Sequence, residues 1–228
     1  MEDCMKQALE IIAKIYTAHK QKFGIPRQSG MVDLPAQIIF EPKYRDPNAV
    51  RGLEGFSHIW VLWQFSEANT DGWQPTVRPP RLGGNRRMGV FATRSPFRPN
   101  SIGLSSLKLE KVEMTDKGPV LHVCGADMLD GTPIYDIKPY IAFTDSHPDA
   151  VCGFTEEYKD YKLKVDFPEE LLNGLPQDLK APITELLACD PRPSYQSDPE
   201  RIYGMEAAGY SIKFTVSGDT LTVTEISK

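Results

Sequence analysis

The sequence predicts a mainly β protein, in which a closed antiparallel β-barrel is followed by a smaller α+β unit. Short apolar segments, several of them alternating, succeed one another as far as residue 141, and turns rich in glycine, aspartate and asparagine separate them. No long helical pattern intervenes, whereas a doubly wound sheet needs a helix between successive strands. The 228 residues are 40% hydrophobic and 25% charged, which is typical of a globular protein.

The expected strands follow these apolar segments. They cover residues 11–17, 36–40, 57–65, 88–93, 102–114, 120–129 and 134–141, although residues 1–12 also fit a helix. The strongest signal is 57–65, where Ile59, Val61 and Trp63 share one face and Trp60 and Leu62 the other. Because both faces are apolar, we expect this strand to be buried on both faces, in a barrel that another element covers.

A change of phase interrupts the segment 102–114. Leu107 and Leu109 share one face, whereas Val112 and Met114 occupy the other. One extra residue in a strand has this effect, so the pattern predicts a β-bulge near Glu110-Lys111.

Turn and helix signals complete the first unit. Asp130-Gly131 is a turn of the hairpin type, and residues 69–72 predict another turn. Asp46 followed by Pro47 supplies an N-cap and a proline at the first helical position, so we expect a brief helix through about Leu53.

The composition changes after about residue 145. From Asp145 to Lys228 there are sixteen acidic residues against eight lysines and arginines. Apolar residues 179, 183, 186 and 187 fall on one helical face, and this helix is expected to begin at Pro182. Alternation in residues 210–216 and 221–223 around Ser217-Gly218-Asp219 predicts a hairpin. We therefore expect a barrel in residues 1–145 and a small second domain in 150–228.

Several protein classes are excluded. No G-x-G-x-x-G follows a strand, and Gly83-Gly84 lies between prolines, so a Rossmann cofactor site is not expected. The four cysteines and four histidines lack the spacing of metal ligands, so we predict no metal. No apolar stretch reaches the ~18 residues of a membrane helix. The N-terminus lacks a secretory signal, which predicts a cytoplasmic protein without membrane contact.

Positive charge is concentrated in one segment. Residues 74–109 hold seven basic residues and no acid. Because the net charge of the whole chain is −5, the remaining residues together carry a charge of −12. Phosphate affinity depends on local charge, because distant acids are screened beyond about 10 Å. Six of the seven are arginines, whose planar guanidinium suits phosphate. We expect a phosphate or nucleic-acid surface here, formed by Arg78, Arg81, Arg86, Arg87 and Arg98.

Two segments are rich in polar residues. Residues 87–105 present Arg94, Arg98 and Asn100 between prolines that restrict the backbone. Residues 127–140 contain Asp130, Thr132, Asp136 and Lys138, which we expect to cluster around one turn.

The order of these motifs resembles the TsaA-like (TrmO) family. The matching blocks are 23–28 (FGIPRQ), 51–60 (RGLEGFSHIW), the arginine-rich 78–103, 129–140 (LDGTPIYDIKPY), 190–195 (DPRPSY) and 198–204 (DPERIYG). Ser101 replaces a proline of the family pattern, and residues 13–18 match the family's first strand loosely. The resemblance implies a β-barrel homodimer that transfers a methyl group from S-adenosylmethionine to N6 of threonylcarbamoyl-adenosine, at position 37 of the tRNA anticodon loop.

The resemblance also implies site residues. The cofactor-binding set is Pro26, Arg27, Gln28, Ser66, Glu67, Arg94, Leu104, Leu129, Asp130, Gly131 and Thr132. Methyl transfer is a displacement that depends on positioning, and the target nitrogen must lose a proton. We take Asp130 and Asp136, with His58 behind them, as candidate bases.

Two other functions fit the same residues. A non-catalytic RNA-binding barrel would use the same arginines, but phosphate binding alone does not need the acidic group around Asp130. A methyltransferase of this fold acting on a small molecule would need no RNA surface.

Overall fold

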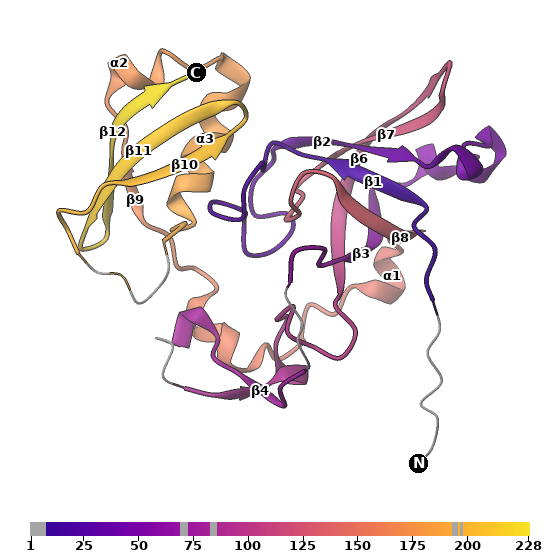
Figure 1. Ribbon diagram of the computed structural model, residues 1–228, viewed down its shortest axis with the longest axis horizontal. Helices are drawn as coiled ribbons and strands as arrows, with labels where there is room; N and C mark the ends of the chain where they lie inside the picture. Colours follow the sequence, from indigo (N-terminus) through magenta and orange to yellow (C-terminus); the bar gives the residue numbers. More distant parts are fainter. Residues whose placement is uncertain (1–7, 69–72, 83–85, 193–195, 197) are drawn as a thin grey trace.

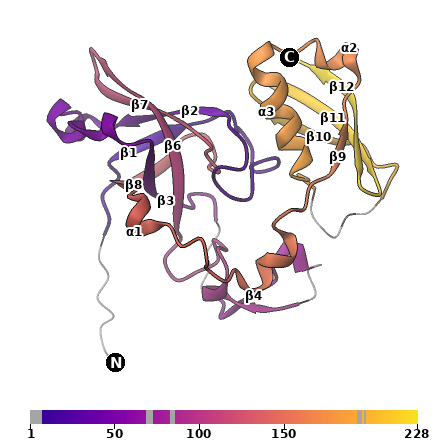
Figure 2. The ribbon, with the colours of Figure 1, turned by 180° about the vertical axis from the view of Figure 1, so that it is seen from behind.

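The protein is described by a computed structural model that covers residues 8–68, 73–82, 86–192, 196 and 198–228, with Arg81 described in its backbone only. The chain forms a barrel and, beside it, a unit of strands and helices (Figure 1). Seen from behind, the segment after α1 (Ala142–Asp145) passes beneath the barrel to reach the second unit (Figure 2).

Six strands close the barrel in the order β1-β2-β7-β6-β3-β8, and all neighbouring pairs are antiparallel. Their bounds are β1 Ala13–Tyr16, β2 Pro35–Phe40, β3 His58–Gln64, β6 Ile102–Thr115, β7 Gly118–Cys124 and β8 Thr132–Pro139. The predicted fold class is confirmed. The predicted bulge is confirmed as well, since the pairing of β6 with β7 shifts between Leu109 and Lys111.

The barrel core comes from alternate residues of each strand. In β3, Ile59, Val61 and Trp63 are buried as predicted. The opposite face is only half-buried, so the prediction of a strand buried on both sides is partly wrong. There the Trp60 indole donates to Asp145 Oδ2 at 2.8 Å and packs against Tyr140, because the chain after β8 folds back over this face.

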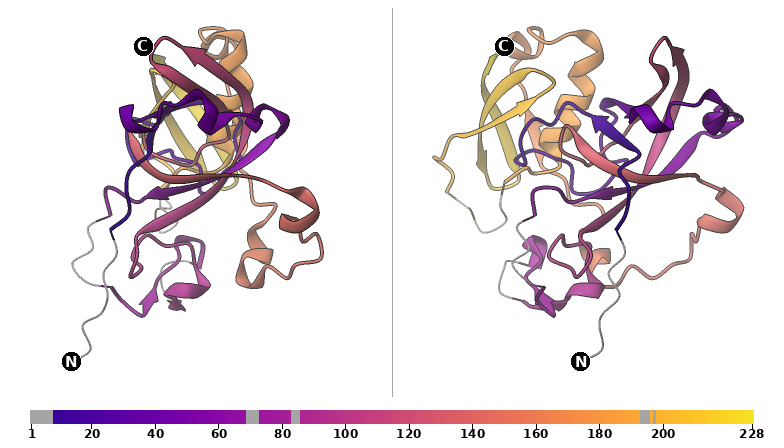
Figure 3. Two further views of the ribbon diagram at one scale, coloured as in Figure 1. Left: turned by 90° about the vertical axis from the view of Figure 1, so that its right-hand side faces the viewer. Right: turned by 45° about the vertical axis from the view of Figure 1, so that its right-hand side comes forward.

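Three long connections leave the same end of the barrel. In an antiparallel barrel every second connection lies at one end. Here residues 17–34 join β1 to β2, 65–101 join β3 to β6, and 125–131 join β7 to β8. The second connection carries a small sheet of β4 (Thr76–Val77) and β5 (Met88–Gly89), which projects from the barrel (Figure 3).

The second unit packs helices on a four-stranded sheet of order β10-β11-β12-β9. Its elements are β9 Lys164–Asp166, α2 Glu169–Leu172, α3 Gln177–Ala188, β10 Tyr203–Ala207, β11 Tyr210–Ser217 and β12 Thr220–Ser227. The predicted hairpin is β11–β12. Val32 and Leu34 of the 17–34 connection join this second core, which ties the loop end of the barrel to the second unit.

The helical turns are short. Short 3₁₀ helices cover Pro42–Tyr44, Pro47–Val50, Leu53–Gly55, Pro80–Leu82, Val90–Ala92 and Gly153–Tyr158. The predicted helix from Asp46 to Leu53 is therefore two separate turns, because Gly52 adopts a left-handed conformation (φ 86°) between them. The Asp46 cap itself forms, and its carboxylate accepts from the Asn48 amide at 2.8 Å.

Two strand predictions were wrong. Of residues 88–93 only Met88–Gly89 is a strand, because the chain turns at Val90 and Thr93 N donates back to Val90 O. The strand expected at 120–129 ends at Cys124, where Gly125 takes φ 82°. Asp130-Gly131 consequently closes no hairpin, since β7 and β8 do not pair.

The expected start of the C-terminal helix was also wrong. The helix α3 begins at Gln177 behind Pro176, and Pro182 lies inside it. Proline at 182 removes one backbone donor, but Ile183, Leu186 and Leu187 are buried and hold the helix on the sheet. The turn predicted at 69–72 and the helical alternative in residues 1–7 lie outside the described residues.

Candidate active site at the loop end of the barrel

The 17–34 and 65–101 connections meet through two predicted cofactor residues. Arg94 Nη1 donates to Gln28 Oε1. Gln28 in turn donates Nε2 to the carbonyl of Arg27 at 2.6 Å. The fold thus brings together two residues that are 66 positions apart in the sequence.

A buried chain of hydrogen bonds lies behind Arg94. Trp63 Nε1 donates to Ser105 Oγ at 2.9 Å, and Ser105 Oγ donates to Asp127 Oδ1 at 2.6 Å. Burial raises the pKa of the Asp127 carboxyl, while the hydrogen bond from Ser105 and the charge of Arg94 act in the opposite direction. A desolvated carboxylate beside an arginine therefore lies at the loop end.

The predicted cofactor turn at 129–132 is held by the chain that follows β1. Asp130 N donates to His19 O, and Gly131 N donates to Ile15 O, both at 2.8 Å. In return Thr17 N donates to Asp130 Oδ1 at 2.9 Å, and Thr17 Oγ1 donates to Met128 O at 3.1 Å. The backbone of the turn is therefore fixed from one side. Leu129 is half-buried and Thr132 is buried at the start of β8.

Arg94 and Asp130 lie at the same end of the molecule. Arg94 donates to Gln28, and two residues further on Gly30 N donates to Gly125 O at 2.9 Å, in the same 125–131 connection as Asp130. The arginine loop and the acidic turn therefore converge, as the sequence predicted. Arg94 is exposed, whereas the Asp130 carboxylate is largely covered by Thr17 and by Lys20, whose Nζ lies 2.6 Å from Oδ2.

The remaining predicted cofactor residues surround this end. Ser66 and Glu67 lie just beyond the end of β3, after Phe65, and are exposed, and Glu67 forms an ion pair with Lys22 at 3.3 Å. Leu104 of β6 is 54% exposed on the outer face of the barrel. Arg27 instead reaches the second unit, where its guanidinium donates to Asp190 O at 3.3 Å and Arg192 O at 3.1 Å.

A cleft of about 490 Å³ lies at the junction of the two units. Pro26, Arg27 and Arg78 line it on the barrel side, and Asp190 and Arg192 on the other. Two predicted cofactor residues and one predicted RNA-binding arginine therefore border one cavity.

The other two candidate bases lie on strands of the barrel, and His58 is the more distant one. His58 begins β3 and pairs with Lys108, so six strand residues, or about 20 Å, separate it from the Gln64 end. Asp136 lies within β8, opposite Leu62, and binds Lys138 at 2.9 Å. The expected cluster of Asp130, Thr132, Asp136 and Lys138 does not form, because Thr132 and Asp136 are separated by about 13 Å of extended strand.

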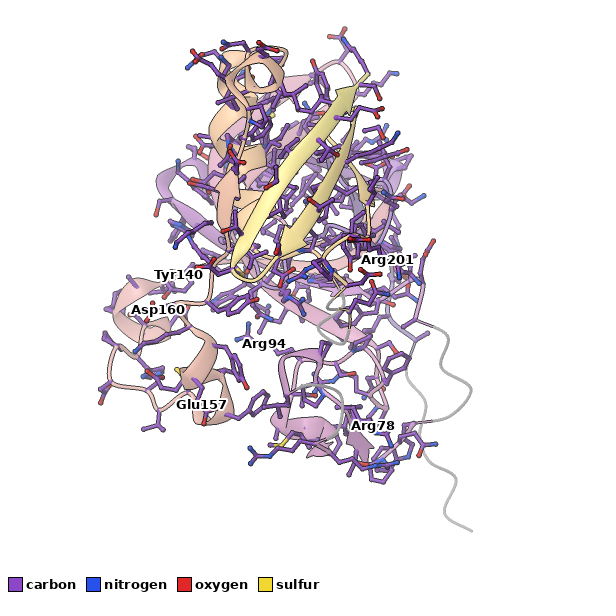
Figure 4. All side chains as sticks on the ribbon, turned by 90° about the vertical axis from the view of Figure 1, so that its left-hand side faces the viewer. Arg78, Arg94, Tyr140, Glu157, Asp160 and Arg201 are labelled. Atoms are coloured by element: carbon purple, nitrogen blue, oxygen red, sulfur yellow. The ribbon has the colours of Figure 1, made fainter. Side chains whose placement is uncertain are left out.

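The arginines of 74–109 have different roles. Arg78, Arg86 and Arg87 are exposed. Arg98 is half-buried and donates to Thr93 O at 3.1 Å, so it holds its own loop. The Arg81 side chain lies outside the described part of the structure. Figure 4 shows Arg78 and Arg94 on one side and Glu157 and Asp160 on the segment across from them, so acidic residues also border this region.

Sequence reasoning missed Asp127, Ser105 and His19. His19 is 2% exposed, and burial lowers its pKa to about 4 although a hydrogen bond with the Ala126 backbone favours the charged form. An acid inside the apolar stretch 124–129 was the one available signal for Asp127. Within the described residues, no group of three His, Cys, Asp or Glu side chains is placed to hold a metal.

The fold and this end of the barrel define a class: a closed barrel whose long connections gather charged side chains at one end. Comparison with known proteins gives the family. The profile of the tRNA-methyltransferase O N-terminal domain matches residues 14–146, and that of the TrmO C-terminal domain matches residues 160–228. The chain belongs to the tRNA-methyltransferase O family.

Two bacterial relatives match over most of their length. The tRNA (adenine(37)-N6)-methyltransferase of Escherichia coli strain K12 is 41% identical over 218 residues, which cover 91% of this chain and 92% of that protein. The protein of the same name from Eikenella corrodens is 51% identical over 162 residues, with 71% and 91% covered. A crystal structure of TrmO from Pseudomonas aeruginosa has a TM-score of 0.77 at 30% identity and covers 98% of this chain and 100% of that chain.

Proposed function

We propose that this protein is an S-adenosylmethionine-dependent tRNA methyltransferase that modifies N6 of adenosine 37. The observation that carries the proposal is the convergence of Arg94, Gln28 and Asp127 with the 129–132 turn at one end of the barrel. The Escherichia coli relative, which has this activity in its name, matches nearly the whole chain. We further propose threonylcarbamoyl-adenosine as the target base.

The residues present fit the cofactor. S-adenosylmethionine supplies a methyl group on a cationic sulfur, together with an adenine, a ribose and an amino-acid tail. The exposed side chain of Leu104 offers an apolar surface for the adenine or the methyl group. The Asp127 and Glu67 carboxylates favour a cation, and Arg94 suits the carboxylate of the tail. The remaining residues of the predicted cofactor-binding set also belong to this proposal.

When bound, the cofactor would supply the methyl group and leave as the neutral thioether, and N6 of the target base would accept the methyl group while its proton passes to a base. The chain's contribution is to hold both reactants in place. Asp130 stays our candidate for the proton acceptor or a ribose contact, although Lys20 and Thr17 already occupy its oxygens. We do not assign this role to His58, which lies about 20 Å from the loop end along β3. Asp136 stays a second candidate, because it and Leu104 flank the same residue of β3, Leu62.

The proposal extends to the domain division, the oligomeric state and the location. We propose the domain division at 145–150, a homodimer, and a cytoplasmic location, which the family resemblance supports. In the residues described, no helix has both the length and the apolar composition to span a membrane. The two rival functions are not favoured, because the near full-length relatives have a tRNA methyltransferase activity in their names.

The decisive experiment combines the purified protein, S-adenosylmethionine and tRNA from a strain that lacks the corresponding gene. Mass spectrometry of the digested tRNA should show one added methyl group on the adenosine beside the anticodon. A protein that binds this tRNA but methylates nothing would support the non-catalytic barrel. Methylation of small molecules alone would support the third function.

Replacing Arg86 and Arg87 together by glutamate is expected to weaken tRNA binding, because two exposed cations are reversed. Each lost contact to single-stranded phosphate should reduce the slope of log affinity against log salt by about 0.7. Filter binding at several salt concentrations measures both quantities. Lys117→Glu, at the β6–β7 turn at the opposite end, is the control, and equal losses in the two variants would contradict a localised RNA surface.

Asp127→Asn is expected to weaken cofactor binding about ten- to hundredfold, equivalent to about 1.4–2.8 kcal/mol, because Arg94 loses its charged partner. Stability at neutral pH should not fall, since burial disfavours the charged carboxyl. The raised pKa means that the wild type gains stability relative to the variant only as the pH falls toward the ordinary value of 3.8. Calorimetric titration and melting curves test this, with exposed Asp116→Asn as the control.

A further inference from the structure

Three large aromatic side chains, Trp73, Phe91 and Phe97, are exposed in the arginine-rich connection, and the first two pack together. Trp73 is 50% exposed and Phe91 is 74% exposed. Their ring centres lie 6.3 Å apart, and the ring planes are inclined by 26°, so the two rings are stacked on each other. Neighbouring exposed aromatics are unusual on a protein surface and mark a binding site more often than isolated ones do.

The local backbone holds these rings outside the core. The strand β4 pairs with β5, and Val90 N donates to Pro75 O at 3.0 Å, which continues the pairing toward Trp73 and Phe91. Val90 is buried, whereas the next residue, Phe91, points outward. The rings are thus presented on a fixed hairpin-like scaffold, and this limits the entropy that a ligand must remove.

Positive charge surrounds the aromatic pair. Arg78, Arg86 and Arg87 are exposed on or next to the same small sheet, and Arg87 Nη1 also donates to Thr76 Oγ1 at 3.1 Å. The segment 74–109 contains no acid. Aromatic rings among arginines are the combination that binds single-stranded RNA, because bases stack on the rings while the arginines bind phosphates.

The pair also lies close to the candidate active site. Phe91 is three residues from Arg94, a separation of at most about 11 Å. The turn in which Thr93 N donates to Val90 O at 3.1 Å shortens this path. A base on Phe91 would therefore belong to the same few nucleotides as a base at the loop end of the barrel.

We propose that Trp73 and Phe91 form a stacking platform for one unpaired base of the tRNA anticodon loop. The proposal rests on the proposed function and adds the residues that recognise the RNA. A second copy of this chain is the other occupant to consider for an exposed apolar pair. A twofold contact would place Arg78, Arg86 and Arg87 against their own copies, and this like-charge arrangement favours RNA instead.

The test measures binding of an anticodon stem-loop RNA that carries 2-aminopurine in the loop, at fixed low salt. Stacking quenches the fluorescence of this base. Phe91→Ala and Trp73→Ala should weaken binding about five- to hundredfold and reduce the quenching. Phe91→Tyr should preserve both, because the ring remains. Phe56→Ala, at the opposite end of the barrel, is the matched control and should change neither.

Calorimetric titration with S-adenosylmethionine should give the wild-type affinity for all four variants. Unchanged stem-loop affinity and quenching in Phe91→Ala and Trp73→Ala would overturn the platform. A wild type that sediments as a dimer and an alanine variant that sediments as a monomer would overturn it too, and would assign the patch to a contact between copies. Because these experiments measure binding, they test the platform independently of catalysis. Absence of methylation by the wild type would count against the proposed function alone.

Discussion

Gly103→Ala is expected to destabilise the barrel by about 1–3 kcal/mol, the usual cost of overpacking a core. Gly103 lies on β6 directly opposite Trp63, and a Cβ atom there would overlap the Trp63 indole. The indole is buried and cannot simply swing away, since its Nε1 donates to Ser105. At about 2–4 °C per kcal/mol, the melting temperature should fall by several degrees.

Tryptophan fluorescence is the appropriate probe, because all three tryptophans, Trp60, Trp63 and Trp73, precede the second unit. Gly204→Ala is the matched control. It makes the same change in a strand, but no atom lies within 4 Å of the added methyl group. Trp63→Phe in the Gly103→Ala background should recover part of the loss, as expected for two side chains that contact each other. If Gly103→Ala and Gly204→Ala melt alike, the close packing of Gly103 on Trp63 is wrong.

The same contact connects barrel packing to the site. Displacing the Trp63 indole would disturb Ser105, which donates to Asp127 beside Arg94. We therefore expect Gly103→Ala to lower cofactor affinity as well, and Gly204→Ala to leave it unchanged.

The strand pattern was predictable wherever one face is buried. The phase change between Leu109 and Val112 located the bulge because a single extra residue exchanges the two faces of a strand. The prediction of a strand over residues 88–93 was wrong. Their apolar composition suggested a strand, but the chain turns after Gly89 and leaves Phe91 exposed, which composition alone does not reveal.

The sequence predicted which segments form the candidate site, but not which side chains contact one another there. The family motifs predict a site that includes Gln28, Arg94 and the 129–132 turn, and all three lie in connections at one end of the barrel. Asp136 was grouped with Asp130 because the two are close in sequence, yet an extended strand separates them. Asp127 was missed because its partners, Ser105 and Arg94, come from other parts of the chain.

His19 is expected to make the stability of the protein depend on pH between about 6.5 and about 4. The folded pKa, about 4, is lower than the ordinary value of 6.5, because burial disfavours the charged imidazole. Between these values the unfolded chain binds the proton and the folded chain does not. The contribution of His19 is therefore present above pH 6.5 and is lost as the pH falls to about 4. A difference of this size corresponds to about 3 kcal/mol.

Urea unfolding at a series of pH values measures this contribution. His19→Gln should give a flatter profile than the wild type in this window, whereas exposed His147→Gln should retain the wild-type slope. His19 O accepts from Asp130 N, and the imidazole contacts the backbone of Ala126, so protonation should also loosen the turn at 129–132. The protection factors of the Asp130 and Gly131 amides, which are corrected for the intrinsic effect of pH on hydrogen exchange, should be lower at pH 4.5 than at pH 7. Protection that stays constant down to pH 4 would contradict a role for neutral His19 in holding the turn.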